Sequence, residues 1–473
     1  MREEGFEPDI PTEAIQQAQA EVESDVVLPA KSAVRDLRAL RWSSIDNPES
    51  RDLDQIEVAE RLADGNIRVR VGIADVDAFV PVGSSMDAHA RANATTVYTG
   101  VVTFPMLPET LSTDKSSLLE DVDRLALIID MVVTEEGTLA STDMYRAVVH
   151  NYAKLDYETV GAWLEGHGDM PEGVARVEGM EAQLRLQDQA AQRLLAQRQK
   201  QGALDLETIE AVPVVENGQV TNLTVPRKNQ ARALIENLMV SANTAMAAFL
   251  EATGLPFIQR VVRSPERWPR IMALAQSLGE SLPDQPHARA LSEFLARRKA
   301  ADPVHFPDLS LAIVKLLGPG EYVVMGSLDE AQGHFSLAAY RYTHSTAPNR
   351  RYADLVIQRL LKAVLTHAAA PYSRTELDQI AQHCTEREDA ARKVERKMRK
   401  VAAAVLMRGR IGEEFDAIVT GVSAKGVFVR VVNPPIEGRV VEGEQGMDVG
   451  ERVRVRLVAT DPDRGYIDFA RNE

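Results

Sequence analysis

Three aspartates, Asp46, Asp52 and Asp54, stand close together early in the chain. The Asn47-Pro48 pair after the first of them favours a turn, because the residue before a proline is pushed out of the helical region. A chain that folds back here can bring the three carboxylates together. Carboxylate oxygens are preferred ligands of Mg²⁺, and a bound ion with an open position suits hydrolysis of a phosphate ester. A solvated acidic turn is the plain alternative.

The composition is that of a globular chain without a general attraction for nucleic acid. Its 473 residues are 45% hydrophobic and 26% charged, enough for two or three domains. The formal net charge of −16 argues against binding of RNA through overall positive charge. Lysines and arginines outnumber acids between residues 387 and 410, which predicts a local basic patch or, equally, a solvated helix face.

Single features disfavour further classes of protein. The one cysteine, Cys384, excludes an internal disulfide, and we expect it to pack within a helix. No apolar run is expected to be long enough to span a bilayer, and residues 1–6 lack the apolar core of a signal peptide. We therefore expect a cytoplasmic monomer with no membrane partner and no organic cofactor.

The elements that must position the aspartates are predicted to form a mixed α/β domain. Alternating apolar residues predict strands over 56–59 and 67–73, joined by a hairpin turn at 63–66, so the aspartates lead into a sheet. Further strands are expected over 125–133 and 144–150. Helical spacing is found over 12–20, 182–198, 230–250, 267–278, 288–300, 352–365 and, as one long helix, 374–407.

The last segment differs in kind from the rest. Short runs of alternating apolar residues, punctuated by glycine, lie at 417–422, 426–431, 452–457 and 466–469. Such runs predict a small β-barrel. The expected organisation is an N-terminal helix and linker (1–38), an α/β domain (39–373), a connecting helix (374–408) and the barrel (409–473).

This tail resembles the five-stranded OB-fold RNA-binding domain named after a ribosomal protein. The matching stretches are 412–415, 421–422, 426–429 and 437–440. The resemblance implies that Phe428 offers a stacking face to a base and that Lys425, Arg430 and Arg439 lie near phosphates. Core packing is the alternative for Phe428.

The larger body, residues 31–366, resembles the RNB domain of the ribonuclease II and ribonuclease R family of 3′-to-5′ exoribonucleases. Four blocks occur in the family's order: 35–38 with 45–46 and 51–54; 73–76; 104–108 with 111–112; and 333–337 with 342–355. One acidic turn arises readily by chance, but four ordered blocks do not. The implied fold class is an α/β (mixed α+β) RNB catalytic domain followed by a small all-β OB-fold barrel.

The resemblance implies a metal site and a phosphate-binding arginine. Asp46, Asp52 and Asp54 would belong to an acidic cluster that holds one or two Mg²⁺ ions, with Mn²⁺ as the substitute. Arg350 would hold the reacting phosphate, because a guanidinium fork suits the charge that develops on it. Asp52, Asp54 and Arg350 are thus the expected catalytic residues.

Aromatic and acidic side chains are implied around this chemistry. Tyr157 would stack on the 3′-terminal base, while Tyr98 and Glu236 would contact the terminal nucleotides and ribose. Stacking tolerates any base, which suits degradation without sequence preference. Half-buried core positions for the tyrosines and a helix-surface position for the glutamate are the alternatives.

The chain departs from the family pattern near the expected chemistry. Gln55 stands where known members carry another aspartate, so a neutral amide replaces an anionic ligand, although its carbonyl oxygen can still bind a hard cation. The segment 202–206 has no phenylalanine to oppose Tyr157. We also expect no room for the two N-terminal cold-shock domains typical of the family.

The sequence is therefore interpreted as a 3′-to-5′ exoribonuclease that hydrolyses single-stranded RNA to nucleoside 5′-monophosphates with Mg²⁺-activated water. Two alternatives stay open. Gln55 could have silenced the nuclease site, leaving an RNB-fold protein that only binds RNA. A metal-dependent phosphodiesterase for small nucleotides would also fit the carboxylates, but it leaves the barrel unexplained.

Overall fold

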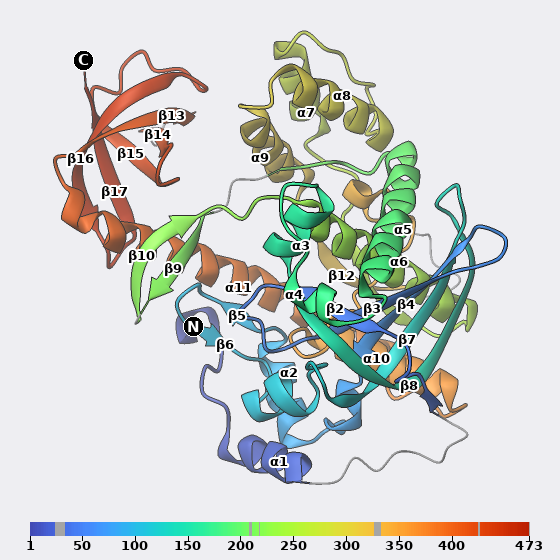
Figure 1. The fold of residues 1–473 in the computed structure, drawn as a ribbon. Helices are drawn as coiled ribbons and strands as arrows, with labels where there is room; N and C mark the ends of the chain where they lie inside the picture. The colour runs from blue at the N-terminus through green and yellow to red at the C-terminus, as the bar shows by residue number, and fades with distance from the viewer. Residues whose placement is uncertain (24–33, 208–210, 217, 326–332, 424–425, 473) are drawn as a thin grey trace.

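The computed structural model describes residues 1–473 except 24–33, 208–210, 217, 326–332, 424–425 and 473. Figure 1 shows a curved sheet with its covering helices, a separate helical group, and a barrel at the C-terminal end of a long helix. The expected mixed α/β domain followed by a small barrel is confirmed.

The main sheet has six strands in the order β1-β8-β2-β3-β4-β7, and β8 also pairs with β7, so the sheet curls back on itself. The predicted hairpin is present, and its register runs from Gln55 opposite Ile73 to Arg61 opposite Ile67. Strands β2 and β8 are parallel and end together, with Asp46 opposite Asp156. The bounds are β1 (Arg35–Asp36), β2 (Trp42–Asp46), β3 (Gln55–Arg61), β4 (Ile67–Ala74), β7 (Asp123–Val133) and β8 (Leu139–Asp156).

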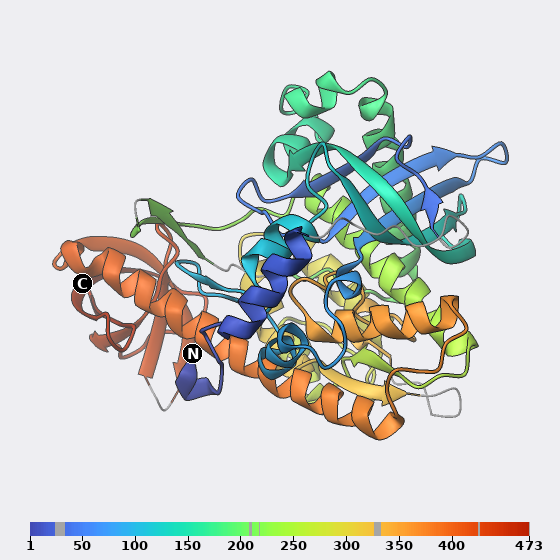
Figure 2. The ribbon, with the colours of Figure 1, turned by 90° about the horizontal axis from the view of Figure 1, so that it is seen from below.

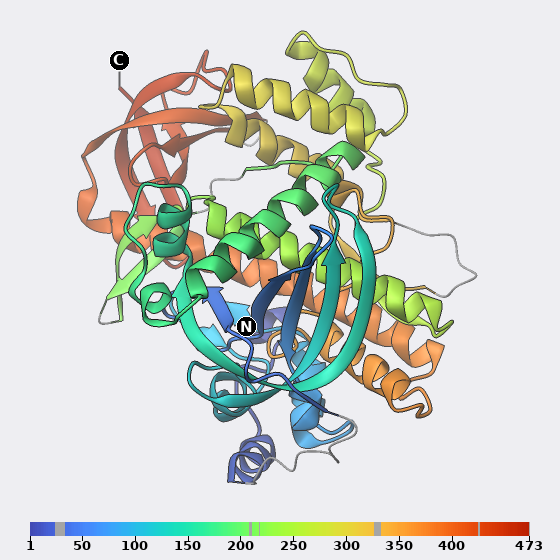
Figure 3. The ribbon, with the colours of Figure 1, turned by 45° about the vertical axis from the view of Figure 1, so that its right-hand side comes forward.

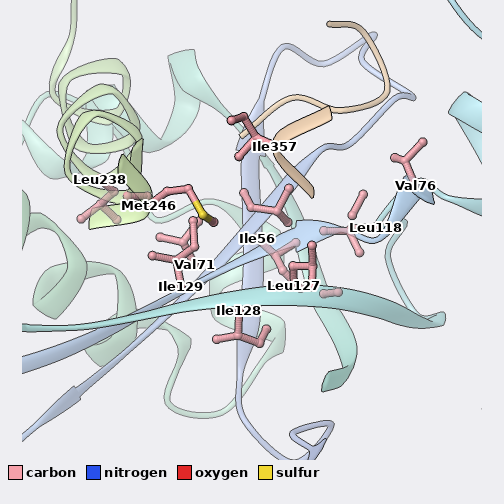
Figure 4. Packing of buried hydrophobic residues seen from close by; sticks show 14 of the residues in the cluster. Ile56, Val71, Val76, Leu118, Leu127, Ile128, Ile129, Leu238, Met246 and Ile357 are labelled. Atoms are coloured by element: carbon pink, nitrogen blue, oxygen red, sulfur yellow. The ribbon is translucent and has the colours of Figure 1, made fainter. Parts of the chain in front are cut away.

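Helices α3 (Tyr157–Leu164), α5 (Met180–Gln201) and α6 (Gln230–Ala252) pack on one face of this sheet and on one another. Figure 4 shows Leu238 and Met246 of α6 beside Val71 and Ile129 of the sheet. Burial of this apolar layer, at about 25 cal/mol per Å², holds the strand ends in place.

By length and composition, α6 is the one described helix that could cross a membrane, so the expectation that no apolar run is long enough was wrong. However, 67% of its most apolar window is buried inside the fold. It starts at the N-cap Asn229, whose side chain accepts the N–H of Arg232. These are the features of a core helix.

Helix α10 (Tyr352–Leu365) packs against the core of the main sheet, to which it contributes Ile357. The remaining elements of this body are α1 (Thr12–Glu23), α2 (Ser85–Asn93), β5 (Val97–Tyr98), β6 (Thr103–Phe104), α4 (Glu172–Arg176), β9 (Val212–Glu216), β10 (Gln219–Thr224), β11 (Phe257–Val261) and β12 (Glu321–Met325).

Helices α7 (Trp268–Ser277), α8 (Ala288–Ala301) and α9 (Phe306–Leu317) share a core of their own, which includes Trp268 and Phe294. Figure 3 shows this group next to the barrel, with α8 against the end of α5. Helix α9 was not predicted, and its sequence contains Pro307. In the structure this proline lies in the first turn, where its missing N–H has no partner to lose.

The long helix α11 (Arg374–Met407) has the predicted bounds and begins with a capping box between Ser373 and Glu376. The strands β13 (Glu414–Ser423), β14 (Gly426–Val431), β15 (Glu437–Glu442), β16 (Arg452–Asp461) and β17 (Tyr466–Arg471) close into a barrel. The barrel core also contains Ala403, Ala404 and Met407 of α11 and Leu223 of β10. Figure 2 shows the resulting joint at the end of the helix.

Candidate active site

The expected site residues gather where β2 and β8 end, beside the start of β3. Asp46 is the last residue of β2, and Tyr157 directly follows β8. The turn after Asp46 is held by its own carboxylate, which accepts the N–H of Asn47 at 2.7 Å and the hydroxyl of Ser50 at 2.9 Å. The Asn-Pro segment thus folds back as the sequence predicted, and it returns the chain to β3.

Asp54 is buried and joins this turn to the loop before α10. Its Oδ1 accepts the backbone N–H of Asn349 at 2.9 Å, and its Oδ2 lies 3.2 Å from Nε of Arg350. Burial raises the pKa of Asp54 to about 7, although the positive charge of Arg350 opposes the rise. The side chain of Arg350 is 44% exposed, so its outer nitrogens remain accessible to a ligand.

Asp52 forms its hydrogen bond with Tyr98, a different partner from those of Asp46 and Asp54. The Tyr98 hydroxyl donates to Oδ2 of Asp52 at 3.1 Å, and the tyrosine is 40% exposed. The backbone N–H of Tyr98 donates to the carboxylate of Glu395 in α11 at 3.1 Å. The basic stretch of the long helix, residues 387–410, therefore passes next to this site on its way to the barrel.

Tyr157 and Glu236 line the approach from the side of α6. The guanidinium carbon of Arg232 lies 4.4 Å from the centre of the Tyr157 ring, and this arginine also donates to Asn47 and Glu158. Glu236 is exposed one turn along α6. It lines a cleft of about 750 Å³ together with Arg232, Leu204 and Leu206. Leucines thus occupy the wall where the sequence lacks a phenylalanine.

The carboxylates do not form a ready cluster. Among the described residues, no three His, Cys, Asp or Glu side chains are placed to hold a metal ion together. Asp46, Asp52 and Asp54 each form hydrogen bonds with a different neighbour, and the charge of Asp52 contributes to the raised pKa of Asp54. Their role as metal ligands, and that of the buried Gln55, stays a prediction.

The donor set nevertheless suits a hard divalent cation. In the part of the chain that the structure describes, both carboxyl oxygens of Glu57 are buried without a hydrogen-bond partner, and the buried Oδ2 of Asp54 has only its ion pair with Arg350. Buried oxygens that lack donors are what a cation such as Mg²⁺ would satisfy.

Sequence reasoning did not select Glu57. It stands between Ile56 and Val58, and this alternation normally indicates an acid on the solvent face of a strand. The structure buries it completely, because α5 covers this part of β3. Burial, and then the negative charge of Asp46, raise the pKa of Glu57 well above its usual value. The sequence carried no signal for this burial.

The barrel residues fall into two groups. Phe428 is 37% exposed and lies directly across the strands from the exposed Arg439, so both side chains share one outer face. Arg430 instead pairs with Asp308 of α9 through contacts of 2.7 and 3.2 Å, and only 9% of its side chain is exposed. Lys425 lies outside the described residues. The RNA contacts of all four stay predictions.

Comparison with known proteins identifies the family. The model of the RNB domain matches residues 34–367, and that of the RNase II-type exonuclease C-terminal S1 domain matches residues 413–472. The chain belongs to the ribonuclease II and ribonuclease R family.

Two curated relatives are similar over nearly all of this chain. Ribonuclease R of Thermotoga maritima is 30% identical over 469 residues, which cover 92% of this chain and 64% of the relative. Ribonuclease R of Escherichia coli is 30% identical over 504 residues, which cover 98% and 60%. The chain thus spans less than two thirds of the length of these members of the ribonuclease II and ribonuclease R family.

Solved structures share the fold. Mycoplasma genitalium RNase R in complex with ribose methylated single-stranded RNA superposes with a TM-score of 0.87 at 23% identity, over 99% of this chain and 76% of that one. Yeast Ssd1, described as a pseudonuclease, superposes with a TM-score of 0.71 at 19% identity, over 91% and 54%. The fold of the ribonuclease II and ribonuclease R family therefore accommodates both an RNA-bound RNase R and a pseudonuclease.

Proposed function

We propose that this chain hydrolyses single-stranded RNA from the 3′ end, releases nucleoside 5′-monophosphates, and uses one or two Mg²⁺ ions, which Mn²⁺ can replace. The observation that carries the proposal is the accessible guanidinium of Arg350 held by the buried Asp54 in an RNB domain. An RNA-bound RNase R with the same fold supports RNA as the substrate. The domain boundaries and the cytoplasmic, monomeric state given above belong to the same proposal.

Each residue is given a separate task in this reaction. Water adds to the scissile phosphorus, and the 3′ oxygen of the preceding nucleotide leaves and takes up a proton. Asp54 engages Nε of Arg350, so the outer nitrogens of the guanidinium can bind the phosphate and stabilise its developing charge. When bound to oxygens of Asp46, Asp52, Asp54 and Gln55, Mg²⁺ would supply Lewis acidity and lower the pKa of water.

The substrate's bases are positioned by the aromatic side chains. Tyr157, backed by Arg232, presents a ring to the last base, and Tyr98 is fixed by its hydrogen bond to Asp52. Outside the catalytic domain, Phe428 and Arg439 offer a stacking face and a positive charge to an upstream nucleotide.

The test is incubation of the purified protein with a 5′-labelled single-stranded oligoribonucleotide and Mg²⁺. We expect a ladder that shortens one nucleotide at a time, with 5′-monophosphates as the released product. Glu60→Gln, an exposed change on β3, serves as the matched control for Asp54→Asn and should leave the ladder unchanged. A folded wild-type protein that leaves the RNA intact in both Mg²⁺ and Mn²⁺ would contradict the proposal.

A second candidate function is RNA binding without cleavage. It is favoured by Gln55, which removes one negative charge from the expected metal site, and by the pseudonuclease that shares this fold. Tight binding of the same oligoribonucleotide with no product would support it. Cleavage of dinucleotides but not of longer RNA would instead indicate the small-nucleotide phosphodiesterase.

A further inference from the structure

Glu57 is a buried acid without a partner among the described residues. It is 0% exposed, and neither carboxyl oxygen accepts a hydrogen bond from any of them. Its direct neighbour across the strands, Ser43, has a hydroxyl in the same condition. A buried polar group is normally satisfied, so each exception requires an explanation such as an ion that the site binds.

Strand geometry places Glu57 on the same face as Gln55. The two residues are separated by one position in β3, so their side chains leave the strand on the same side. Ile56, between them, points to the other face, where a Cβ on Gly72 of β4 would meet both Ile56 and Trp42. The Cα atoms of Gln55 and Glu57 are about 6.7 Å apart at the usual rise of a strand, a distance that the longer side chain of glutamate helps to span.

The surroundings of Glu57 supply oxygen atoms and negative charge. The charge that acts on its carboxyl is that of Asp46, at the end of the neighbouring strand β2. Asp46 and Glu57 in turn both act on the hydroxyl of Tyr157. Arg232, the nearby cation, is stacked on the ring of Tyr157 and donates to Asn47 and Glu158 instead. Within the described part of the chain, the carboxyl of Glu57 therefore has acidic and hydroxyl neighbours but no hydrogen-bonded counter-ion.

We propose that Glu57 is a ligand of the divalent cation, together with Asp46 and Gln55, and that it restores the negative charge lost where Gln55 replaces an aspartate. The proposal rests on the function proposed above, because it concerns the same metal site. A cation here would satisfy the two unpartnered oxygens of Glu57 and hold it against Asp46, whose charge otherwise repels it. The negative charge that Gln55 lacks would thus be supplied by Glu57, two positions further along β3.

The test measures metal binding without RNA. Mn²⁺ is titrated calorimetrically into the full-length wild type, Glu57→Gln, Gln55→Asp and the double variant, and the melting temperature of each is recorded with and without Mn²⁺. Glu60→Gln on the exposed end of β3 is the control for loss of a glutamate from this strand. Glutamine keeps the shape of Glu57, and the circular dichroism spectrum checks that each variant is folded.

We expect Glu57→Gln to weaken Mn²⁺ binding about tenfold or more and to abolish the rise in melting temperature that Mn²⁺ causes. Gln55→Asp should tighten binding, and the double variant, which has the wild-type charge, should bind within about threefold of the wild type. Glu60→Gln should bind as the wild type does.

Two results would overturn the proposal: an unchanged Mn²⁺ affinity in folded Glu57→Gln, or no Mn²⁺ binding by the folded wild type. If Glu57 is only a structural acid, its replacement shifts the melting temperature equally with and without Mn²⁺. The RNA assay separates this inference from the proposed function. A protein that binds Mn²⁺ through Glu57 but leaves RNA uncut refutes the function alone, and one that cuts RNA with unchanged Mn²⁺ affinity in Glu57→Gln refutes the ligand alone.

Discussion

Replacing Asp54 by asparagine should stop RNA cleavage and, in the metal-free protein, stabilise the fold at alkaline pH. Asparagine keeps the size of the side chain and an oxygen for the N–H of Asn349, but it removes the buried charge. In the wild type, burial raises the pKa of Asp54 from 3.8 to about 7. Unfolding releases this carboxyl into water, where it ionises freely.

The sign and size of the effect follow from this difference in pKa. For an acid whose pKa is raised by folding, the stability it contributes is full below the unfolded value and is lost as the pH rises through the folded value. With values of 3.8 and about 7, this one group costs the wild type about 2 kcal/mol between about pH 5.5 and pH 8.5. An asparagine side chain does not titrate, so the advantage of Asp54→Asn should grow by about 2 kcal/mol over that range.

The assay is urea unfolding of both proteins in EDTA at the two pH values, followed by the fluorescence of the tryptophans, of which Trp42 lies in the core of the sheet. Added Mg²⁺ at alkaline pH should narrow the gap, because a bound cation favours the ionised form of Asp54. A difference between the proteins that is the same at both pH values would refute the reasoning. Normal cleavage by Asp54→Asn would remove this carboxylate from the reaction.

Five further outcomes can be measured. Arg350→Lys should lower the single-turnover cleavage rate about a hundredfold and change the dissociation constant of RNA far less, because lysine lacks the bidentate fork of arginine. Equal losses of cleavage rate and RNA affinity would mean that Arg350 binds the ground state as strongly as the transition state. Phe428→Ala should weaken RNA binding by about 1–3 kcal/mol, and Arg439→Ala should reduce the salt slope of binding by about 1, whereas unchanged affinities would place the RNA elsewhere. Gln55→Asp should lower the Mg²⁺ concentration for half-maximal cleavage, and an unchanged titration would place residue 55 outside the metal shell. Burial lowers the pKa of His334 from 6.5 to about 4. The stability of the fold should therefore fall as the pH drops below 6.5, by about 2 kcal/mol at about pH 5. His334→Gln should abolish this loss of stability, as measured by urea unfolding.

Local sequence patterns predicted the elements that carry strong periodicity. The hairpin of β3 and β4 was predicted because alternation and a turn signal agree there, and the long helix α11 was predicted from its helical spacing. Helix α9 was missed because a proline can either break a helix or begin one. The hairpin of β9 and β10 was also missed, since Pro213 interrupts the short apolar run of β9 and the two strands pack against α11 rather than the main sheet.

The sequence indicated that the candidate aspartates share one turn, but it did not indicate the partner of each carboxylate. The spacing of Asp46, Asp52 and Asp54 indicated a turn, and the turn is present. Which distant group each carboxylate meets, such as Arg350 for Asp54, depends on contacts between segments far apart in the chain. For the same reason the pairing of the barrel's Arg430 with α9 could not be recognised. The burial of a glutamate in β3 was missed because alternation within one strand does not reveal that helices cover its second face.

The long helix α11 sets the distance between the candidate site and the barrel. Its Glu395 accepts a hydrogen bond from Tyr98 beside the site, and its Met407 belongs to the core of the barrel. The intervening helix measures about 18 Å at 1.5 Å per residue, and it has no hinge of glycine or proline within that stretch. The reach from barrel to site is therefore set by helical rise rather than by a flexible tether. If RNA binds as proposed, a strand shorter than this reach would contact the candidate site or the barrel but would not bridge the two.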